Sequence, residues 1–284
     1  MRHFCGAVIL LAQLFSCLPG QACTLWAANG TEVRQGGSLI VKNRDWQPDH
    51  RQDLKLVSPA KGYKYVGLYA VDGDHKGLKA GINEKGLVVV SATAGSIPTG
   101  ARNTMPYTVG LNTRLLRECG SVDDALAKIA LFLGPQILML ADREKIAVVE
   151  IGPEGAFAAT VRQNGTLYHT NHYIADSMLA YNRVSGTSSR TRLERIAELL
   201  EGGQRPYDLE AFIGFAADKN AGPDNSIFRE GSTPRKARTL ATWAVKLPPA
   251  GSPELYIDIL NPGEQPRIVR IQADDVFNGK APLD

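Results

Sequence analysis

Cysteine is scarce in this chain, and no apolar run reaches the ~20 residues that a membrane-spanning helix needs. The 284 residues contain four cysteines, none of them at the paired spacing of a zinc site. Histidines at the spacing that places two metal ligands on one helix face are absent, and so is a glycine-rich phosphate loop. The sequence therefore points away from a metal centre and a bound nucleotide, and we expect neither a metal nor a cofactor.

Clusters of basic residues are missing as well. The formal net charge is only +3, and lysine and arginine form no run. Proteins that bind nucleic acids usually concentrate positive charge on one face, so we expect no nucleic-acid partner. Apolar residues make up 44% of the chain and charged residues 21%, which is typical of a globular protein with a sizeable core. No repeat, low-complexity segment or linker stands out, which indicates a single domain.

The longest apolar stretch lies near the start of the chain. A positively charged start precedes the apolar residues 4–15, and the small residues Gly20 and Ala22 occupy the −3 and −1 positions of a cleavage site. This order is typical of a secretory signal peptide. We therefore expect residues 1–22 to be a signal peptide, residues 23–284 to form the mature domain, and the protein to be secreted or periplasmic. A buried N-terminal helix is the alternative interpretation.

Cleavage after Ala22 would make Cys23 the first residue of the mature protein. Its thiol would then lie beside an α-amine that titrates near pH ~8 and can accept the thiol proton. Lipoprotein signals also end in a cysteine, which is acylated as a membrane anchor. Such signals usually have leucine where this chain has Gly20, so a lipid anchor is the alternative. If Cys23 is catalytic, we expect the other mature cysteine, Cys119, to be buried and unpaired.

Strand-like and helix-like segments follow each other in blocks. Apolar segments separated by glycine and asparagine predict strands over 24–28, 36–43, 64–71, 77–83, 86–94, 136–152 (a hairpin), 156–162, 166–173, 239–247, 254–260 and 267–272. Helical periodicity predicts helices over 105–119, 121–133, 188–203 and 208–219. Blocks of strands around blocks of helices indicate an α+β domain with two packed antiparallel sheets covered by helices.

Five motifs carry a resemblance to a known family. They are CT at 23–24, VKNRDW at 41–46, AGINEKGLVVVSATAG at 80–95, HTNHY at 169–173 and SSRTRLERIAELL at 188–200. In this order and spacing the chain resembles the N-terminal-nucleophile (Ntn) amidases of the choloylglycine-hydrolase and penicillin-V-acylase group. It is still more similar to the related acyl-coenzyme A:6-aminopenicillanate acyltransferase family. The resemblance implies a four-layer αββα fold, with the nucleophile at the start of a central strand, and activity on linear amide C–N bonds.

The resemblance implies roles for individual residues. Cys23 matches the nucleophile, and Asp45 matches the aspartate that orients the nucleophile and its amino group. Asn171 matches the asparagine whose side-chain amide donates to the oxyanion of the tetrahedral intermediate. Taken without the resemblance, Asp45 would also suit a turn after a strand, and Asn171 would also suit an Asx turn.

Other positions of the site have two candidates or a changed residue. Arg190 matches a site arginine, with Arg192 as the alternative in a neighbouring register. The bile-salt enzymes have a cation that falls on Lys42 here, with Arg44 two residues further on as the alternative. They also have an asparagine near Thr93, where a backbone N–H donates to the oxyanion; a backbone donor survives the change to threonine.

Three polar residues have simpler explanations. We include Asn83 among the candidates for oxyanion or substrate binding, although turn formation in its motif explains it as well. His169 and His172 would permit a Cys–His pair. Because an α-amine is available as the base, we expect both histidines to be structural.

These predictions combine into an exported cysteine amidohydrolase that cleaves a small-molecule N-acyl amide through a thioester on Cys23. An acyltransferase with the same nucleophile and an amine acceptor is the first alternative. A lipid-anchored envelope protein that binds a ligand without turnover is the second, and we expect membrane association only in that case. Bile-salt conjugates, penicillin V, acyl-homoserine lactones and small aminoacyl amides are all substrates within the superfamily, and neither the substrate nor the oligomeric state follows from the sequence.

Overall fold

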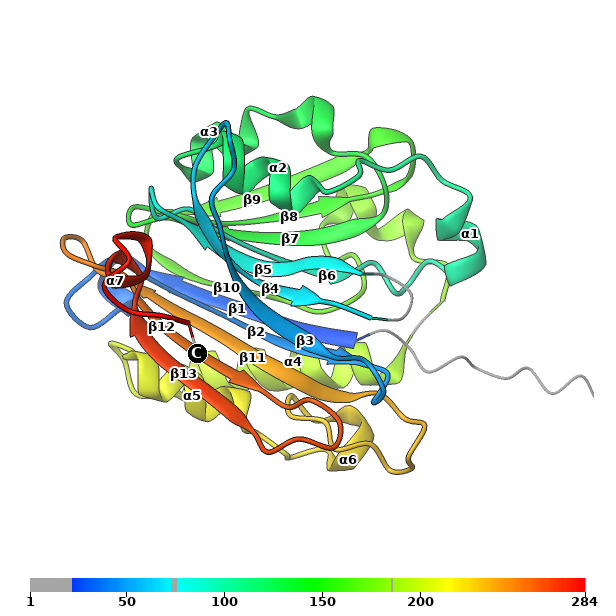
Figure 1. Ribbon diagram of the computed structural model, residues 1–284. Helices are drawn as coiled ribbons and strands as arrows, with labels where there is room; N and C mark the ends of the chain where they lie inside the picture. Colours follow the sequence, from blue (N-terminus) through cyan, green and yellow to red (C-terminus); the bar gives the residue numbers. More distant parts are fainter. Residues whose placement is uncertain (1–21, 73–75, 185, 284) are drawn as a thin grey trace, which may run out of the picture.

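The computed structural model describes residues 22–72, 76–184 and 186–283, and it shows two antiparallel sheets packed face to face (Figure 1). Of the predicted signal peptide only Ala22 belongs to the described residues, and the rest of that prediction lies outside them. No helix among the described residues has the length and apolar character needed to cross a membrane.

One sheet has six strands and the other has seven. The six-stranded sheet has the order β10-β1-β2-β11-β12-β13. Its strands are β1 (Ala22–Asn29), β2 (Ser38–Trp46), β10 (Gly165–His169), β11 (Arg238–Leu247), β12 (Glu254–Ile259) and β13 (Arg267–Gln272). The seven-stranded sheet follows chain order from β3 to β9. Its strands are β3 (Gln52–Val57), β4 (Tyr65–Ala70), β5 (Gly77–Asn83), β6 (Val88–Thr93), β7 (Gln136–Ala141), β8 (Ile146–Ile151) and β9 (Phe157–Arg162).

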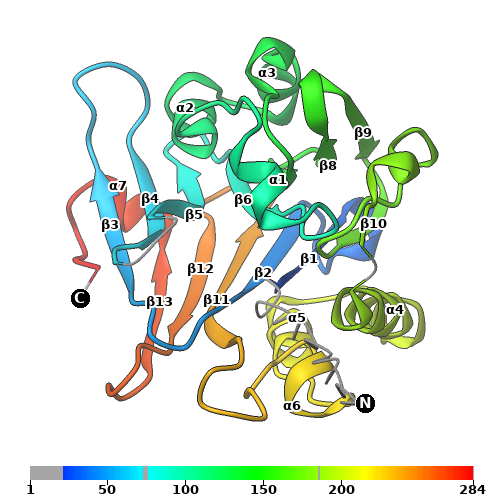
Figure 2. The ribbon, with the colours of Figure 1, turned by 90° about the vertical axis from the view of Figure 1, so that its right-hand side faces the viewer.

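Helices cover the outer faces of both sheets, as Figure 2 shows. Over the seven-stranded sheet lie α2 (Leu111–Glu118) and α3 (Val122–Leu126), while α1 (Thr99–Asn103) lies beyond the end of β6 and packs its Ala101 against the core between the sheets. Against the six-stranded sheet lie α4 (Thr187–Gly202), α5 (Leu209–Ala216) and α6 (Gly222–Asn225), and a short α7 (Ala273–Phe277) follows β13. The predicted α+β fold with αββα layers is thus confirmed.

Strand β1 is buried along its whole length because it lies in a middle layer with neighbours on both faces. Its side chains alternate as a strand requires. Cys23, Leu25 and Ala27 belong to the core between the sheets. Trp26 and Ala28 belong to the core that the six-stranded sheet shares with α4 and α5. The two faces of β1 therefore offer two separate environments, and Cys23 lies on the inner one.

Two of the predicted helices have other boundaries in the structure, and one strand was not predicted. The helix predicted over 105–119 begins only at Leu111, because Gly110 adopts a left-handed conformation with φ of 65° before it. The helix predicted over 121–133 ends at Leu126 and is followed by a short 3₁₀ turn. Strand β3 was missed; it is the edge strand of its sheet and exposes much of its surface, so its sequence carries little alternation.

Candidate active site

The backbone of Cys23 is held at both ends of the residue. Its N–H donates a hydrogen bond to Asn171 Oδ1 over 2.8 Å, and its carbonyl accepts one from Arg192 Nη1 over 2.6 Å. Arg192 also donates to Thr24 Oγ1 (2.8 Å) and to Asn171 Oδ1 (3.1 Å). One buried guanidinium thus connects the start of β1 with the segment after β10. Cys23 is therefore fixed through main-chain atoms, while its side chain turns to the inner face.

Arg192, and not Arg190, is the arginine at Cys23. Arg192 is fully buried, whereas Arg190 is exposed and lines a small surface pocket with His172 and Arg183. Two residues on a helix differ by about 200° in direction, so the two arginines point to opposite sides of α4. Our prediction of Arg190 as the site arginine is corrected, and the alternative register is the one that the structure supports.

Asn171 joins Cys23 to the end of strand β6. Its Nδ2 donates to the carbonyl of Thr93 over 2.9 Å, while its Oδ1 accepts from Cys23 and Arg192. An amide nitrogen has two N–H groups, so one remains beyond the bond to Thr93. The structure brings Cys23, Asn171 and Thr93 together as the resemblance implies. The donation by Asn171 to an oxyanion stays a prediction.

Asp45 lies on the outer face of the sheet, opposite Ala22 in the β1–β2 pairing. It is fully buried, and its Oδ1 accepts a hydrogen bond from Thr239 Oγ1 over 2.9 Å. Its Oδ2 is buried without a hydrogen-bond partner among the described residues. Burial raises the pKa of Asp45, and the positive charges of Arg229 and Arg192 partly offset this. In the described part of the chain, one oxygen of the carboxyl group at the start of β1 therefore has no donor.

Arg229 is a site residue that the sequence analysis missed. It is 5% exposed, and its Nε and Nη1 are buried without a hydrogen-bond partner in the described part of the chain. Its backbone N–H donates to Thr239 Oγ1, the same hydroxyl that donates to Asp45. Arg229 lies in the loop before β11, outside every motif, so the sequence carried no signal for it.

Two cations of β2, Arg44 and Lys42, lie on the inner face with the thiol of Cys23. Arg44 is directly opposite Cys23 in the β1–β2 pairing, and Lys42 is two residues away on the same face. Lys42 Nζ donates to the carbonyl of Lys79 over 2.8 Å. Arg44 donates through Nε to Gln52 and lies over the ring of Trp46, 5.3 Å from its centroid. The sequence left open which of Lys42 and Arg44 serves the site, and the structure places both there.

Lys79 was not predicted as a site residue, because a β-bulge turns its side chain to the inner face. In the β4–β5 pairing Leu68 opposes Ala80 and Tyr69 opposes Leu78, so Lys79 is the extra residue of β5. Bulges often re-aim a side chain beside a functional site. Burial, with the charges of Arg44 and Lys42, lowers the pKa of Lys79 to about 7. Burial likewise lowers the pKa of Lys42 to about 8. Burying a positive charge costs free energy unless the charge is paired, so these lysines favour the binding of an anion beside them.

Asn83 is corrected from a candidate ligand to a structural residue. Its Nδ2 donates to the carbonyls of Leu116 (2.8 Å) and Cys119 (2.7 Å). Its Oδ1 accepts from the backbone N–H groups of Lys85 and Leu87. These bonds hold the β5–β6 turn against the end of α2 and use both N–H groups of the amide. Asn83 lies at the end of β5 away from Lys79, so it does not belong to the site.

The two histidines contact other groups than the thiol. His169 Nε2 contacts Glu150 Oε1 over 2.8 Å, and His172 Nδ1 contacts Ser189 Oγ over 2.8 Å. Burial, with the charges of His169, Arg190 and Arg192, lowers the pKa of His172 to about 4. These contacts agree with the structural role that we expect. Cys119 is buried and free, as predicted. The described residues hold no cluster of three or more metal-ligating side chains.

Comparisons with known proteins point to one family. A family model described as acyl-coenzyme A:6-aminopenicillanic acid acyl-transferase matches residues 33–252. A variant of conjugated bile acid hydrolase from Clostridium perfringens is similar in structure, with a TM-score of 0.60, 15% identity and coverage of 92% of this chain and 94% of that chain. Penicillin V acylase from Agrobacterium tumefaciens is similar in structure with a TM-score of 0.57 and 15% identity, and the match covers 89% of this chain and 86% of that chain. At such identities the likeness shows the fold alone. No curated protein matches the sequence.

Proposed function

Because this chain belongs to the acyl-coenzyme A:6-aminopenicillanic acid acyl-transferase family, we propose that it is an exported cysteine amidohydrolase acting on a linear N-acyl amide. The family and the fold indicate amide hydrolysis or acyl transfer. One observation carries the finer assignment to Cys23. Its nitrogen is hydrogen-bonded to Asn171 and its carbonyl to Arg192, so that the thiol is held on the inner face among Lys42 and Arg44.

We propose that cleavage after Ala22 completes the site. Ala22 occupies the position opposite Asp45, where Asp45 Oδ2 and two nitrogens of Arg229 lack partners among the described residues. Removing Ala22 replaces a peptide N–H by an α-amine with more donors and leaves room beside the carboxylate. The new amine keeps Asn171 Oδ1 as an acceptor 2.8 Å away and gains Asp45 as a second one. The free acceptor Asp45 Oδ2 is thus matched to the donors of a chain terminus.

The chemistry follows from these positions. The neutral α-amine of Cys23 takes the thiol proton, directly or through a water, and the thiolate attacks the amide carbon of the substrate. The cations of the inner face stabilise the thiolate. Asn171 Nδ2 and a backbone N–H near Thr93 donate to the oxyanion, each contributing about 3 kcal/mol. The ammonium returns its proton to the leaving amine as the C–N bond breaks, and water then hydrolyses the thioester.

Processing is tested on the exported protein itself. We expect its N-terminal sequence to begin Cys-Thr-Leu-Trp, with an unmodified Cys23, because the small residues Gly20 and Ala22 suit signal peptidase. Intact mass spectrometry and N-terminal sequencing make the measurement. A mass several hundred daltons higher would identify a lipid anchor instead, and a chain that begins at Thr24 would remove the amine that the mechanism needs.

Turnover is tested with a panel of N-acyl amides and detection of the released amine. We expect the mature protein to release amine from at least one of them, and the Cys23→Ala variant to release none. The family description favours an acyltransferase as the second candidate. Adding a competing amine separates the two reactions, because a transferase diverts the acyl group to that amine while a hydrolase continues to form the free acid. A mature protein that is inactive on the whole panel would contradict the proposal.

A further inference from the structure

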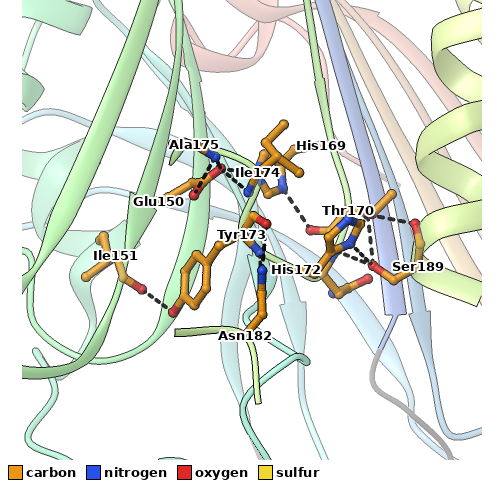
Figure 3. Close-up of polar contacts among 11 residues, drawn as sticks. Glu150, Ile151, His169, Thr170, His172, Tyr173, Ile174, Ala175, Asn182 and Ser189 are labelled. Carbon is orange, nitrogen blue, oxygen red and sulfur yellow. Dashed lines mark hydrogen bonds and ion pairs between the residues drawn. The ribbon is translucent and has the colours of Figure 1, made fainter. Parts of the chain in front are cut away.

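The segment that carries Asn171 is held from two sides, and one of the two supports is outside the site described above. Figure 3 shows this segment between β8 and α4. On the α4 side the backbone N–H of Asn171 donates to Ser189 Oγ over 3.0 Å, and Thr170 Oγ1 contacts the same hydroxyl over 2.9 Å. These bonds fix the start of the segment, directly at Asn171.

The support on the other side is the carboxylate of Glu150, the last residue but one of β8. Its Oε1 contacts His169 Nε2 over 2.8 Å and accepts from the backbone N–H groups of Ile174 (2.9 Å) and Ala175 (3.1 Å). The carboxylate thus bonds to the residues on both flanks of the segment (Figure 3). Asn171 lies between these attachment points. The carboxylate therefore holds the two ends of the turn that contains Asn171 close to each other.

Glu150 is an unusual residue at this place. It is 2% exposed and faces the space between the sheets, where a free carboxylate would cost several kcal/mol. Burial alone would raise the pKa of Glu150, but the bonds from His169, Ile174 and Ala175 lower it, so the group is ionised. Because its three hydrogen-bond donors all come from one segment, the buried carboxylate holds that segment in place. The proposed mechanism uses Glu150 for no proton transfer.

We propose that Glu150 is a positioning residue for Asn171. By fixing His169, Ile174 and Ala175, it places Asn171 Oδ1 within 2.8 Å of the Cys23 nitrogen and Asn171 Nδ2 beside Thr93. The inference rests on the proposed function of Cys23. A shift of about 1 Å in such an alignment costs up to 10²-fold in rate, so the loss is expected in kcat.

The experiment compares Glu150→Ala with Glu150→Gln in the mature protein. The alanine removes every acceptor, and we expect kcat to fall about 30-fold with little change in KM. The glutamine keeps an oxygen in the place of Oε1, which can still accept from His169, Ile174 and Ala175, so it should restore kcat to within about fivefold of the original protein. Thr160→Ala is the matched control, because Thr160 lines the same cavity of about 360 Å³ as Glu150 and lies on the neighbouring strand β9.

Two readouts do not depend on turnover. The side-chain amide resonances of Asn171 should shift in Glu150→Ala, and alkylation of Cys23 by iodoacetamide should change in rate. Cys119 is the internal reference, because burial raises its pKa to about 11. If Glu150→Ala does not fold, Glu150→Asp replaces it: the charge stays, but the carboxylate withdraws by one bond, and we expect about tenfold lower kcat with the same shift of the amide resonances.

The outcomes separate the two claims. If the original protein turns over no amide, the proposed function fails, while the amide resonances and the alkylation rate still decide the role of Glu150. If folded Glu150→Ala or Glu150→Asp keeps the resonances of Asn171, the alkylation rate and any turnover of the original protein, the positioning role is overturned. A loss of thermal stability alone, at unchanged kcat, also overturns it, since that result describes a residue needed only for folding.

Discussion

A protein with one uncleavable residue before Cys23 is expected to lose amide turnover by about 10²–10⁴-fold, the usual effect of losing acid–base catalysis. The thiol, Asp45, Asn171 and both histidines all remain in this variant. Only the α-amine is gone, because the extra peptide bond converts it to an amide that cannot accept a proton. Asn171 Oδ1 already accepts from the Cys23 amide in the unprocessed chain, so the alignment of the residue is kept. The measurement is kcat on the best substrate of the amide panel.

Two controls separate loss of the base from crowding of the site. The same extension, ended by a recognition site from which a specific protease cuts directly before Cys23, should recover full turnover on cleavage. His172→Gln in the processed enzyme should keep most of its activity, because this histidine contacts Ser189 and stays neutral near pH 7. If the extended protein is fully active and His172→Gln is inactive, the histidine is the base and the N-terminal-nucleophile assignment is wrong.

Replacing Arg192 by methionine is expected to lower kcat/KM at least 100-fold, while the same change at Arg190 costs less than twofold. Arg192 donates charged hydrogen bonds to Cys23 O and Asn171 Oδ1, each worth about 1.5–3 kcal/mol. Their loss takes this donor from the buried carbonyl of Cys23 and leaves Asn171 Oδ1 with one donor fewer. A loss of about 3 kcal/mol corresponds to roughly 100-fold in rate. Arg190 is exposed. The two variants have the same composition, which makes them a matched pair.

Kinetics are compared on protein shown by circular dichroism to be folded. Should Arg192→Met not fold, Arg192→Lys keeps the charge but supplies fewer donors in a different geometry, and we expect a fall of at least tenfold. Equal activities for the Arg190 and Arg192 variants would contradict the assignment of Arg192. A larger loss for Arg190→Met would restore the register that the motif first suggested.

The fold and the nucleophile strand were accessible from the sequence because both depend on local patterns. Alternation and turn residues placed the start of β2 and the β5–β6 hairpin close to where the structure has them. The error at Arg190 was also avoidable. Ile196 and Leu200 are buried on α4 at a spacing of four, and one further step back along this stripe reaches Arg192. Arg190 lies off the stripe, so helical periodicity alone selects the correct arginine.

Lys79, Arg229 and Glu150 could not be predicted because their positions depend on distant parts of the chain. Strand alternation without the bulge would place Lys79 on the opposite face of β5 from Ala80 and Ile82. Arg229 reaches the site from a loop before β11, and its neighbour Asp45 is far away in sequence. Glu150 lies in an apolar run that predicts a strand, but the run does not indicate which residues Glu150 contacts. The packing of the two sheets brings Lys79 and Glu150 to the site, and the pairing of β11 with β2 brings Arg229 there.

Because Cys23 is held by its main-chain atoms, the side chain at position 23 can be exchanged without loss of these contacts. Asn171 and Arg192 hold the nitrogen and the carbonyl oxygen, and neither bond involves the sulfur. A serine or a threonine at this position would be presented in the same register, with the same amine beside it. The scaffold therefore separates the choice of nucleophile from its alignment. A single substitution at position 23 would change the reactivity of the nucleophile. A change of its alignment would require several substitutions in α4 and in the segment after β10.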